Sequence, residues 1–317
     1  MIDLDGKVGQ VAVGGGGRYI VMHQPDKGQL VLFDASTAKT TVTAADTGDV
    51  RLAAGLSRLV LYAPNGNMLR VYSLPGLTKV FETTSPMDNF KSIAMGSRTD
   101  GPLLGSGTFG DLILLDINAD GVKEVEGSRG KPGHHWDNIR ATPDGTAFAT
   151  FSRLGNNDKV KLLTEANRKW KVTDLPLVPF VGADGNFYGH GTAVNRTGQQ
   201  VSVGGVGAGS GVWYVPAVSG NTGMFVKLAV TTTGVGAKNK KVTLTVHANR
   251  NADVPAFGTT ALTGIPEFET LVDIRINSIT IPWDRILDHH LFLIPDAKLL
   301  VTLSANKDKL YLRKLGL

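Results

Sequence analysis

Two segments of the chain carry the residue types best suited to chemistry, histidine and tryptophan with arginine or aspartate nearby. The candidates are His134, His135, Trp136, Trp283, Arg285, His289 and His290. Imidazole rings with a carboxylate, which Asp137 or Asp288 could supply, suit zinc, iron or copper. Exposed tryptophan and arginine, by contrast, dominate the binding energy of many protein interfaces. The two segments therefore indicate either a metal site or a surface that binds a partner.

The glycine-rich runs do not fit a nucleotide-binding loop. Residues 14–17 are four glycines, but Arg18 and Tyr19 follow them and lead into strand-like sequence. A phosphate-binding loop needs Gly-Lys-Ser/Thr at the start of a helix. Residues 204–211 also lack a following helix. We therefore expect both runs to form turns or loops.

Composition removes several other classes of site. The chain has no cysteine, which excludes disulfides, zinc–thiolate sites and cysteine nucleophiles. Its net charge is +5, but the basic residues are spread out, with a short cluster only at Lys238, Lys240 and Lys241. Nucleic acid is therefore not an expected partner. No stretch approaches the roughly 20 apolar residues of a membrane span, and the first residues lack the pattern of a secretion signal. The compartment stays open, as does the possibility that the chain is a module of a larger protein.

A sequence repeat along the chain indicates which structural elements hold these two segments. Five segments share a polar turn, alternating apolar residues and a polar stop, with equivalent positions at Leu30, Leu69, Leu112, Val160 and Leu310. Weaker copies place Val201 and Val242 in the same column. The spacing of roughly 40 to 50 residues is that of a four-stranded propeller blade. Turn residues and two further apolar strands precede most copies, and a variable fourth strand follows.

The repeat predicts an all-β chain, a seven-bladed β-propeller of four-stranded antiparallel blades in one domain spanning residues 1–317. The expected blades lie near residues 9–45, 48–85, 89–127, 138–175, 178–211, 212–260 and 268–317. An open ring would leave an unpaired edge. Because the last blade ends at its third strand, we expect residues 1–8 to supply its outer strand and close the ring.

Several segments resemble WD40-like and bacterial quinoprotein-like propellers. Residues 133–151, GHHWDNIRATPDGTAFATF, resemble the start of a WD40-type blade, and residues 33–39, FDASTAK, are similar to a strand end of both families. The resemblance implies an interaction scaffold in which His134 holds its loop by a hydrogen bond. It departs from the pattern at Ala38, where glycine is usual, and no blade ends in Trp-Asp. Quinoprotein blades dock on one another through a tryptophan, and this chain has Val42 near the corresponding place. No pyrroloquinoline quinone is therefore expected.

The blade assignment places both candidate segments in loops, residues 127–138 and 264–290, on one face of the disc. They belong to blades four and seven, which are well separated, so a shared metal ion is disfavoured. The first strands, which line the channel, carry few acidic residues, which also disfavours an acid–base pair. We therefore expect a non-catalytic, monomeric disc without a cofactor that binds a protein or peptide. The alternative is a small-ligand or glycan-active propeller enzyme with a site in the channel.

Overall fold

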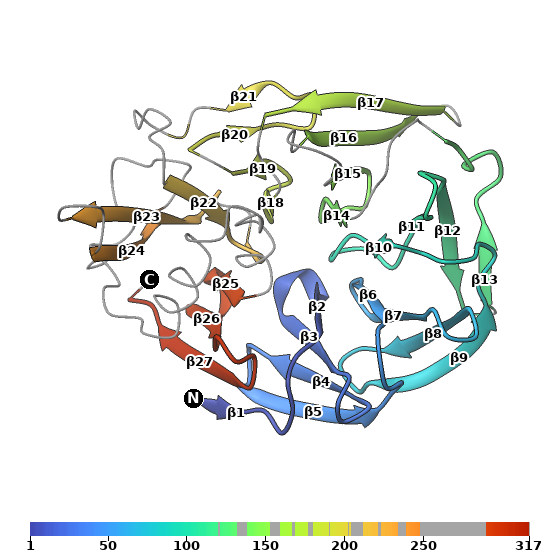
Figure 1. Cartoon of the computed structure of the whole chain (residues 1–317), viewed down its shortest axis with the longest axis horizontal. Helices are drawn as coiled ribbons and strands as arrows, with labels where there is room; N and C mark the ends of the chain where they lie inside the picture. Colours follow the sequence, from blue (N-terminus) through green and yellow to red (C-terminus); the bar gives the residue numbers. More distant parts are fainter. Residues whose placement is uncertain are drawn as a thin grey trace.

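Seven antiparallel sheets stand around a central axis in the computed structural model, with the first strand of each near the centre and the last at the rim (Figure 1). The structure describes residues 1–119, 121–131, 138–152, 159–166, 169–176, 180–189, 191–201, 203, 212–220, 223–233, 239–247 and 290–316. Within these ranges no helix is long and apolar enough to cross a membrane. The arrangement confirms the predicted all-β, seven-bladed propeller.

The first four sheets follow one another along the chain. Blade one contains β2 (Gln10–Gly14), β3 (Tyr19–Gln24), β4 (Gln29–Asp34) and β5 (Lys39–Ala44). Blade two contains β6 (Arg51–Ala54), β7 (Arg58–Ala63), β8 (Met68–Ser73) and β9 (Thr78–Thr84). Blade three contains β10 (Ser92–Ala94), β11 (Leu103–Ser106), β12 (Leu112–Asn118) and β13 (Gly121–Glu124). Blade four contains β14 (Asn138–Ala141), β15 (Ala147–Ser152), β16 (Lys159–Ala166) and β17 (Lys169–Leu175).

The last three sheets are less regular. Blade five contains β18 (Phe180–Val181), β19 (Phe187–Tyr188), β20 (Ala193–Val194) and β21 (Gln200–Val201). The described part of blade six contains β22 (Val212–Pro216), β23 (Phe225–Thr233) and β24 (Asn239–His247). Blade seven contains β25 (Leu291–Ile294), β26 (Leu299–Leu303), β27 (Lys309–Lys314) and, as its outer strand, β1 (Ile2–Asp3).

The N-terminal strand closes the ring, as predicted. In the register of β1 with β27, Ile2 lies opposite Leu310 and Asp3 opposite Lys309. The Leu4 amide donates to the Asp308 carbonyl at 2.8 Å, which continues the pairing beyond the strand. The first residues of the chain therefore complete a sheet built from its last residues.

The equivalent positions of the repeat lie in the third strand in most blades, as predicted, but not in blade five. Leu30, Leu69, Leu112, Val160 and Leu310 all lie in the third strand of their sheets, as does Val242. Val201, which the spacing assigned to a third strand, lies instead in the outer strand β21. The third strand of that blade is β20, only two residues long, so it gives no alternating pattern; the alternating Val201 and Val203 lie at the end of the outer strand and just beyond it.

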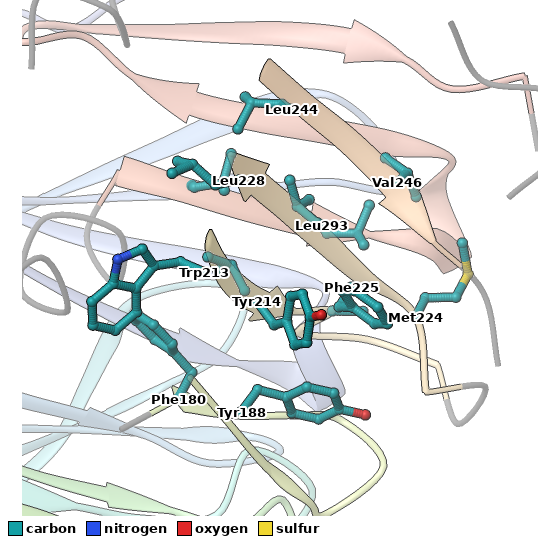
Figure 2. Packing of buried hydrophobic residues seen from close by; sticks show 14 of the residues in the cluster. Phe180, Tyr188, Trp213, Tyr214, Met224, Phe225, Leu228, Leu244, Val246 and Leu293 are labelled. Carbon is teal, nitrogen blue, oxygen red and sulfur yellow. The ribbon is translucent and has the colours of Figure 1, made fainter. Parts of the chain in front are cut away.

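The hydrophobic core lies between neighbouring blades. All six side chains of β3 are buried, because one face of the sheet packs on blade two and the other on blade seven. In Figure 2, Tyr188 of blade five, Tyr214 and Phe225 of blade six and Leu293 of blade seven gather in one such cluster. The outer strand β5 is mostly exposed. Each blade thus needs both neighbours to bury its two faces, which is the physical reason for a closed ring.

Candidate functional site

The antiparallel order of the strands gives the disc two chemically different faces. The turn face carries the connections between first and second strands, such as residues 15–17, 96–101 and 217–220, and those between third and fourth strands. The loop face carries the connections between second and third strands, such as residues 107–111, and those from one blade to the next. A channel runs between the two faces along the axis of the ring.

The channel encloses a cavity of about 230 Å³ whose wall is formed mainly by the first strands of all seven blades. Small side chains keep it open, namely Ala12, Ala53, Ala54, Ala94, Ala141 and Ala183. Its polar side chains are Gln10, Ser97, Asn138 and Arg140. No carboxylate is among the described residues of this wall, and Arg140 is its one charged side chain.

Backbone hydrogen bonds join the inner turns of three blades at the turn face. The Gly15 amide of blade one donates to the Gly55 carbonyl of blade two at 2.8 Å, and the Gly16 amide donates to the Ser97 carbonyl of blade three at 2.7 Å. Both glycines have positive φ, 61° and 66°, a conformation that costs glycine little. The four-glycine run is therefore a turn that links three blades, as its lack of a following helix predicted.

Arg98 adds a longer contact across the same end of the channel. Its Nη2 donates to the Gly220 carbonyl at 2.8 Å, which joins blade three to blade six. Gly17 has a φ of 97° and packs so closely on the Val218 carbonyl that a Cβ there would overlap the oxygen. Because these contacts cross the turn end of the channel, we take the loop face as the side from which a ligand reaches the cavity.

Arg140 is held against an aromatic side chain of the next blade. Its neighbour Ile139 packs into the cluster between blades three and four, so the alternation of β14 turns Arg140 toward blade five. There its guanidinium carbon lies 5.3 Å from the centre of the Phe180 ring, a cation–π contact. Phe180 in turn meets the Trp213 ring edge-on at 6.3 Å, and Figure 2 shows the two rings side by side. The Arg140 guanidinium, the Phe180 ring and the Trp213 ring therefore form one row of contacts from blade four through blade five to blade six.

Asn138 stands two residues before Arg140 on the same strand and carries an unused donor. Its Nδ2 is buried without a hydrogen-bond partner, whereas most buried polar atoms have one. Asn138 also lines the channel. Because residues two apart on a strand lie on one side of the sheet, Asn138 and Arg140 are both turned toward blade five.

An exposed aromatic side chain marks the loop face of blade three. Phe109 is 71% exposed at the tip of the turn between β11 and β12, where the Gly107 amide donates to the Asp111 carbonyl at 2.8 Å. The Lys131 ammonium lies 5.9 Å from the centre of the Phe109 ring and 3.7 Å from an Asp111 carboxylate oxygen. Phe109 is not among the site residues predicted from the sequence, although an aromatic residue between two glycines in a turn could have indicated it.

The predicted site residues lie mostly outside the described residues. This applies to His134, His135, Trp136, Trp283, Arg285 and His289. His290 is described and is buried, with 1% of its surface exposed, directly before β25. The two ends of the predicted loop at residues 127–138 are also described. Lys131 at one end lies beside Phe109, and Asn138 at the other end lies in the channel wall.

A polar cleft on the turn face serves a different purpose. It is lined by Arg98, Asp144, Asp184 and Arg196 together with Pro143, Ala183 and Gly185. Burial raises the pKa of Asp144, but hydrogen bonds donated by Thr142, Arg196 and Thr146 outweigh it and lower that pKa to about 2. The Arg196 guanidinium lies 2.5 Å from the carboxylate and joins blade five to blade four. The acidic groups of this cleft therefore hold turns and blades together.

The described residues contain no group of three or more side chains of the metal-binding types that could hold one ion. This statement does not extend to the histidines outside the described ranges. For them the choice between a metal site and a partner-binding surface stays as the sequence left it.

Comparison with known proteins supports the fold and leaves the function open. No protein-family model matches the chain, and no curated protein matches its sequence. Among solved structures, hydrazine synthase from Kuenenia stuttgartiensis is similar, with 12% identity and a TM-score of 0.56 over 99% of this chain and 97% of that one. The WD40 repeats of RRP9 have 8% identity and a TM-score of 0.54 over 95% and 88% of the two chains. The dihydro-heme d1 dehydrogenase NirN has 13% identity and a TM-score of 0.51 over 96% and 65%. Propellers named as enzymes and as WD40 repeats are thus equally similar, so these likenesses show the fold alone.

Proposed function

We propose that the chain is a non-catalytic propeller that binds a protein or peptide partner on its loop face. The observation that carries this proposal is Phe109, a 71% exposed aromatic side chain on a hydrogen-bonded turn. Aromatic side chains on rigid supports contribute much contact area to an interface at a small cost in conformational entropy. A turn between two paired strands is such a support.

The surroundings of Phe109 favour a partner that extends toward the channel. The Lys131 ammonium lies over one face of the ring, and Asn138 and Arg140, which follow it in the sequence, line the cavity. We propose that a partner seated on Phe109 places a part of its chain at the mouth of the channel. Because the net charge is +5 and the channel wall holds Arg140, an acidic partner is favoured.

The WD40 likeness agrees with a binding role, since propeller scaffolds present variable loops on a rigid ring. The alternative, a propeller enzyme with a site in the channel, rests on the likeness to proteins such as NirN. No carboxylate base lies among the described residues of the channel wall, which favours binding over acid–base chemistry.

The test is a selection from a random 12-residue peptide display library on the immobilised full chain. We expect a recurring sequence whose synthetic peptide binds at one saturable site with micromolar affinity, measured by fluorescence anisotropy. The same peptide incubated with the protein should be recovered intact by mass spectrometry. Absence of any saturable peptide, or conversion of the bound peptide to a product, would overturn the proposal.

A further inference from the structure

The outer strand of blade one ends its sheet with an open hydrogen-bonding edge. The order of this sheet is β2-β3-β4-β5, and β5 lies at the rim of the disc (Figure 1). Directly after β5, the Ala45 amide donates to the Gly28 carbonyl at 2.8 Å, in register with the pairing of β5 and β4. Because hydrogen bonds alternate along an antiparallel pair, the amides and carbonyls of Thr40, Val42 and Ala44 point away from β4. A further strand can pair with them.

The surroundings of β5 leave this edge accessible. Five of its six residues are exposed, Thr43 is half-buried, and Val42 is 55% exposed. The strand pairs with β4 residue by residue and without a bulge. Between Lys39 and Ala44 it contains only threonine and valine, which are β-branched and favour strands. A regular edge without charge or proline along its length is a template for pairing with another strand.

The other outer strands within the described residues are protected against such pairing. β1 and β21 have two residues each, and β13 has four, of which the last two are charged. β9 carries Lys79 and Glu82 and has a bulge at Val80, which no residue of β8 opposes. β17 carries two lysines and an aspartate. Shortness, charges and bulges all prevent pairing between sheet edges. Among the described outer strands, β5 is the one that has none of these protections between its ends.

A second copy of β5 fits this edge. The extended segment runs from Lys39 to Ala45, so an antiparallel copy is centred on Val42. Val42 then faces Val42 of the second copy, and Thr40 faces Ala44, which pairs the outward amides and carbonyls in about six hydrogen bonds. Lys39 faces Ala45, so no like charges lie opposite each other, and the two valines contact across the axis. The edge is therefore complementary to itself.

We infer that two copies of the chain associate by antiparallel pairing of their β5 strands, with the two-fold axis at Val42. A symmetric pair in which each copy offers the same surface is the commonest form of protein dimer. One pair of strands buries less than the roughly 800 Å² per partner of a standard interface, so the dimer is weak, with a dissociation constant of about 10–100 µM. Phe109 belongs to blade three, so the association leaves it accessible, and the inference does not depend on the proposed function.

The experiment is sedimentation equilibrium of the full chain over concentrations from about 2 to about 500 µM, which bracket the expected dissociation constant. We expect a monomer–dimer equilibrium for the wild-type chain. Val42→Lys and Val42→Glu each place like charges opposite one another at the axis, so each variant alone should dimerise at least about tenfold more weakly. An equimolar mixture of the two places Lys opposite Glu and should dimerise within about threefold of the wild-type affinity. Recovery in the mixture distinguishes pairing at Val42 from a general effect of added charge.

The matched control is Val80→Lys, because Val80 is also an exposed valine of an outer strand, with 52% of its surface exposed. Its strand has the bulge, so dimerisation should change less than about twofold. Chemical denaturation should give both Val42 variants and the control the wild-type free energy of unfolding, since both side chains are exposed.

Three results would overturn the inference. The first is a wild-type chain that stays monomeric over the whole range, which decides alone whatever the variants do. The second is a dimer that Val42→Lys and Val80→Lys weaken equally, since that would place the contact elsewhere or make it a diffuse effect of charge. The third is a mixture of Val42→Lys and Val42→Glu that dimerises no better than either variant alone.

Discussion

The two ends of the central channel differ in how they are built. At the turn end, glycines with positive φ and backbone hydrogen bonds tie the inner turns of several blades together, and Arg98 reaches across to Gly220. At the loop end, Asn138 keeps a donor without a partner, and elsewhere on the same face Phe109 is exposed. The difference teaches that one face of the disc holds the ring together, whereas the other retains unused binding capacity. Changes on the turn face should therefore act on stability, and changes on the loop face on binding.

The largest effect is expected from removing the strand that closes the ring on which both faces depend. Deletion of residues 1–8 removes β1 and the buried side chains of Leu4 and Val8, and it exposes the edge of β27. We expect the free energy of unfolding, from chemical denaturation, to fall by about 4 kcal/mol or more, because two or three apolar side chains leave the core. An exposed strand edge should also promote aggregation. Unfolding at the wild-type midpoint would mean that β1 does not close the ring.

The next effect tests the close packing of the turn face. Gly17→Ala meets two obstacles, the positive φ of 97° and the overlap of its Cβ with the Val218 carbonyl, so we expect a loss of about 3 kcal/mol. Gly48 has a similar φ of 89° with nothing near its Cβ position, which makes Gly48→Ala the matched control. It should lose about 1 kcal/mol from backbone strain alone. Equal losses in the two variants would show that the turn does not pack closely on blade six.

A smaller effect concerns the pH dependence of the turn-face cleft. The pKa of Asp144, about 2, is below the ordinary value, so its ionisation stabilises the folded state above pH 4. This contribution is lost as the pH falls through about 2. Because the carboxylate is 44% exposed, the effect on stability is small and is better followed at the residue itself. Arg196→Gln should raise the pKa of Asp144 in a carboxyl NMR titration, whereas Lys91→Gln should not. A pKa that stays near 2 in Arg196→Gln would contradict the role of this ion pair.

The sequence predicted the ring well because the residue patterns that indicate strands and turns are local. Alternating apolar residues and turn residues fall on the first three strands of blades one to four and seven, and the leftover residues 1–8 indicated the closing strand. Blade five failed at Val201 because its strands have two residues each, too few for alternation to show. There the visible alternation, Val201 and Val203, begins in the outer strand and runs past its end.

The candidate site could be predicted only in part. Tryptophan and histidine marked the loop at residues 127–138, whose described ends lie beside Phe109 and in the channel. The exposure of Phe109 depends on how the surrounding blades pack around its turn, and no local sequence pattern indicates that packing. The contact of Arg140 with Phe180 joins two blades and depends on which way each first strand turns its side chains. Such facts follow from the packing of the ring and not from the repeat.

The most direct test of the central claim compares one exposed apolar side chain on each face. Phe109 on the loop face is 71% exposed, and Leu56 on the turn face is 49% exposed. A peptide selected on the wild-type chain is titrated against Phe109→Ala and Leu56→Ala by fluorescence anisotropy, after chemical denaturation has shown that both variants keep the wild-type stability. We predict at least about tenfold weaker binding for Phe109→Ala, the size of an interface hot spot, and a change below twofold for Leu56→Ala. Wild-type affinity in Phe109→Ala, or a larger loss in Leu56→Ala, would contradict the assignment of binding to the loop face.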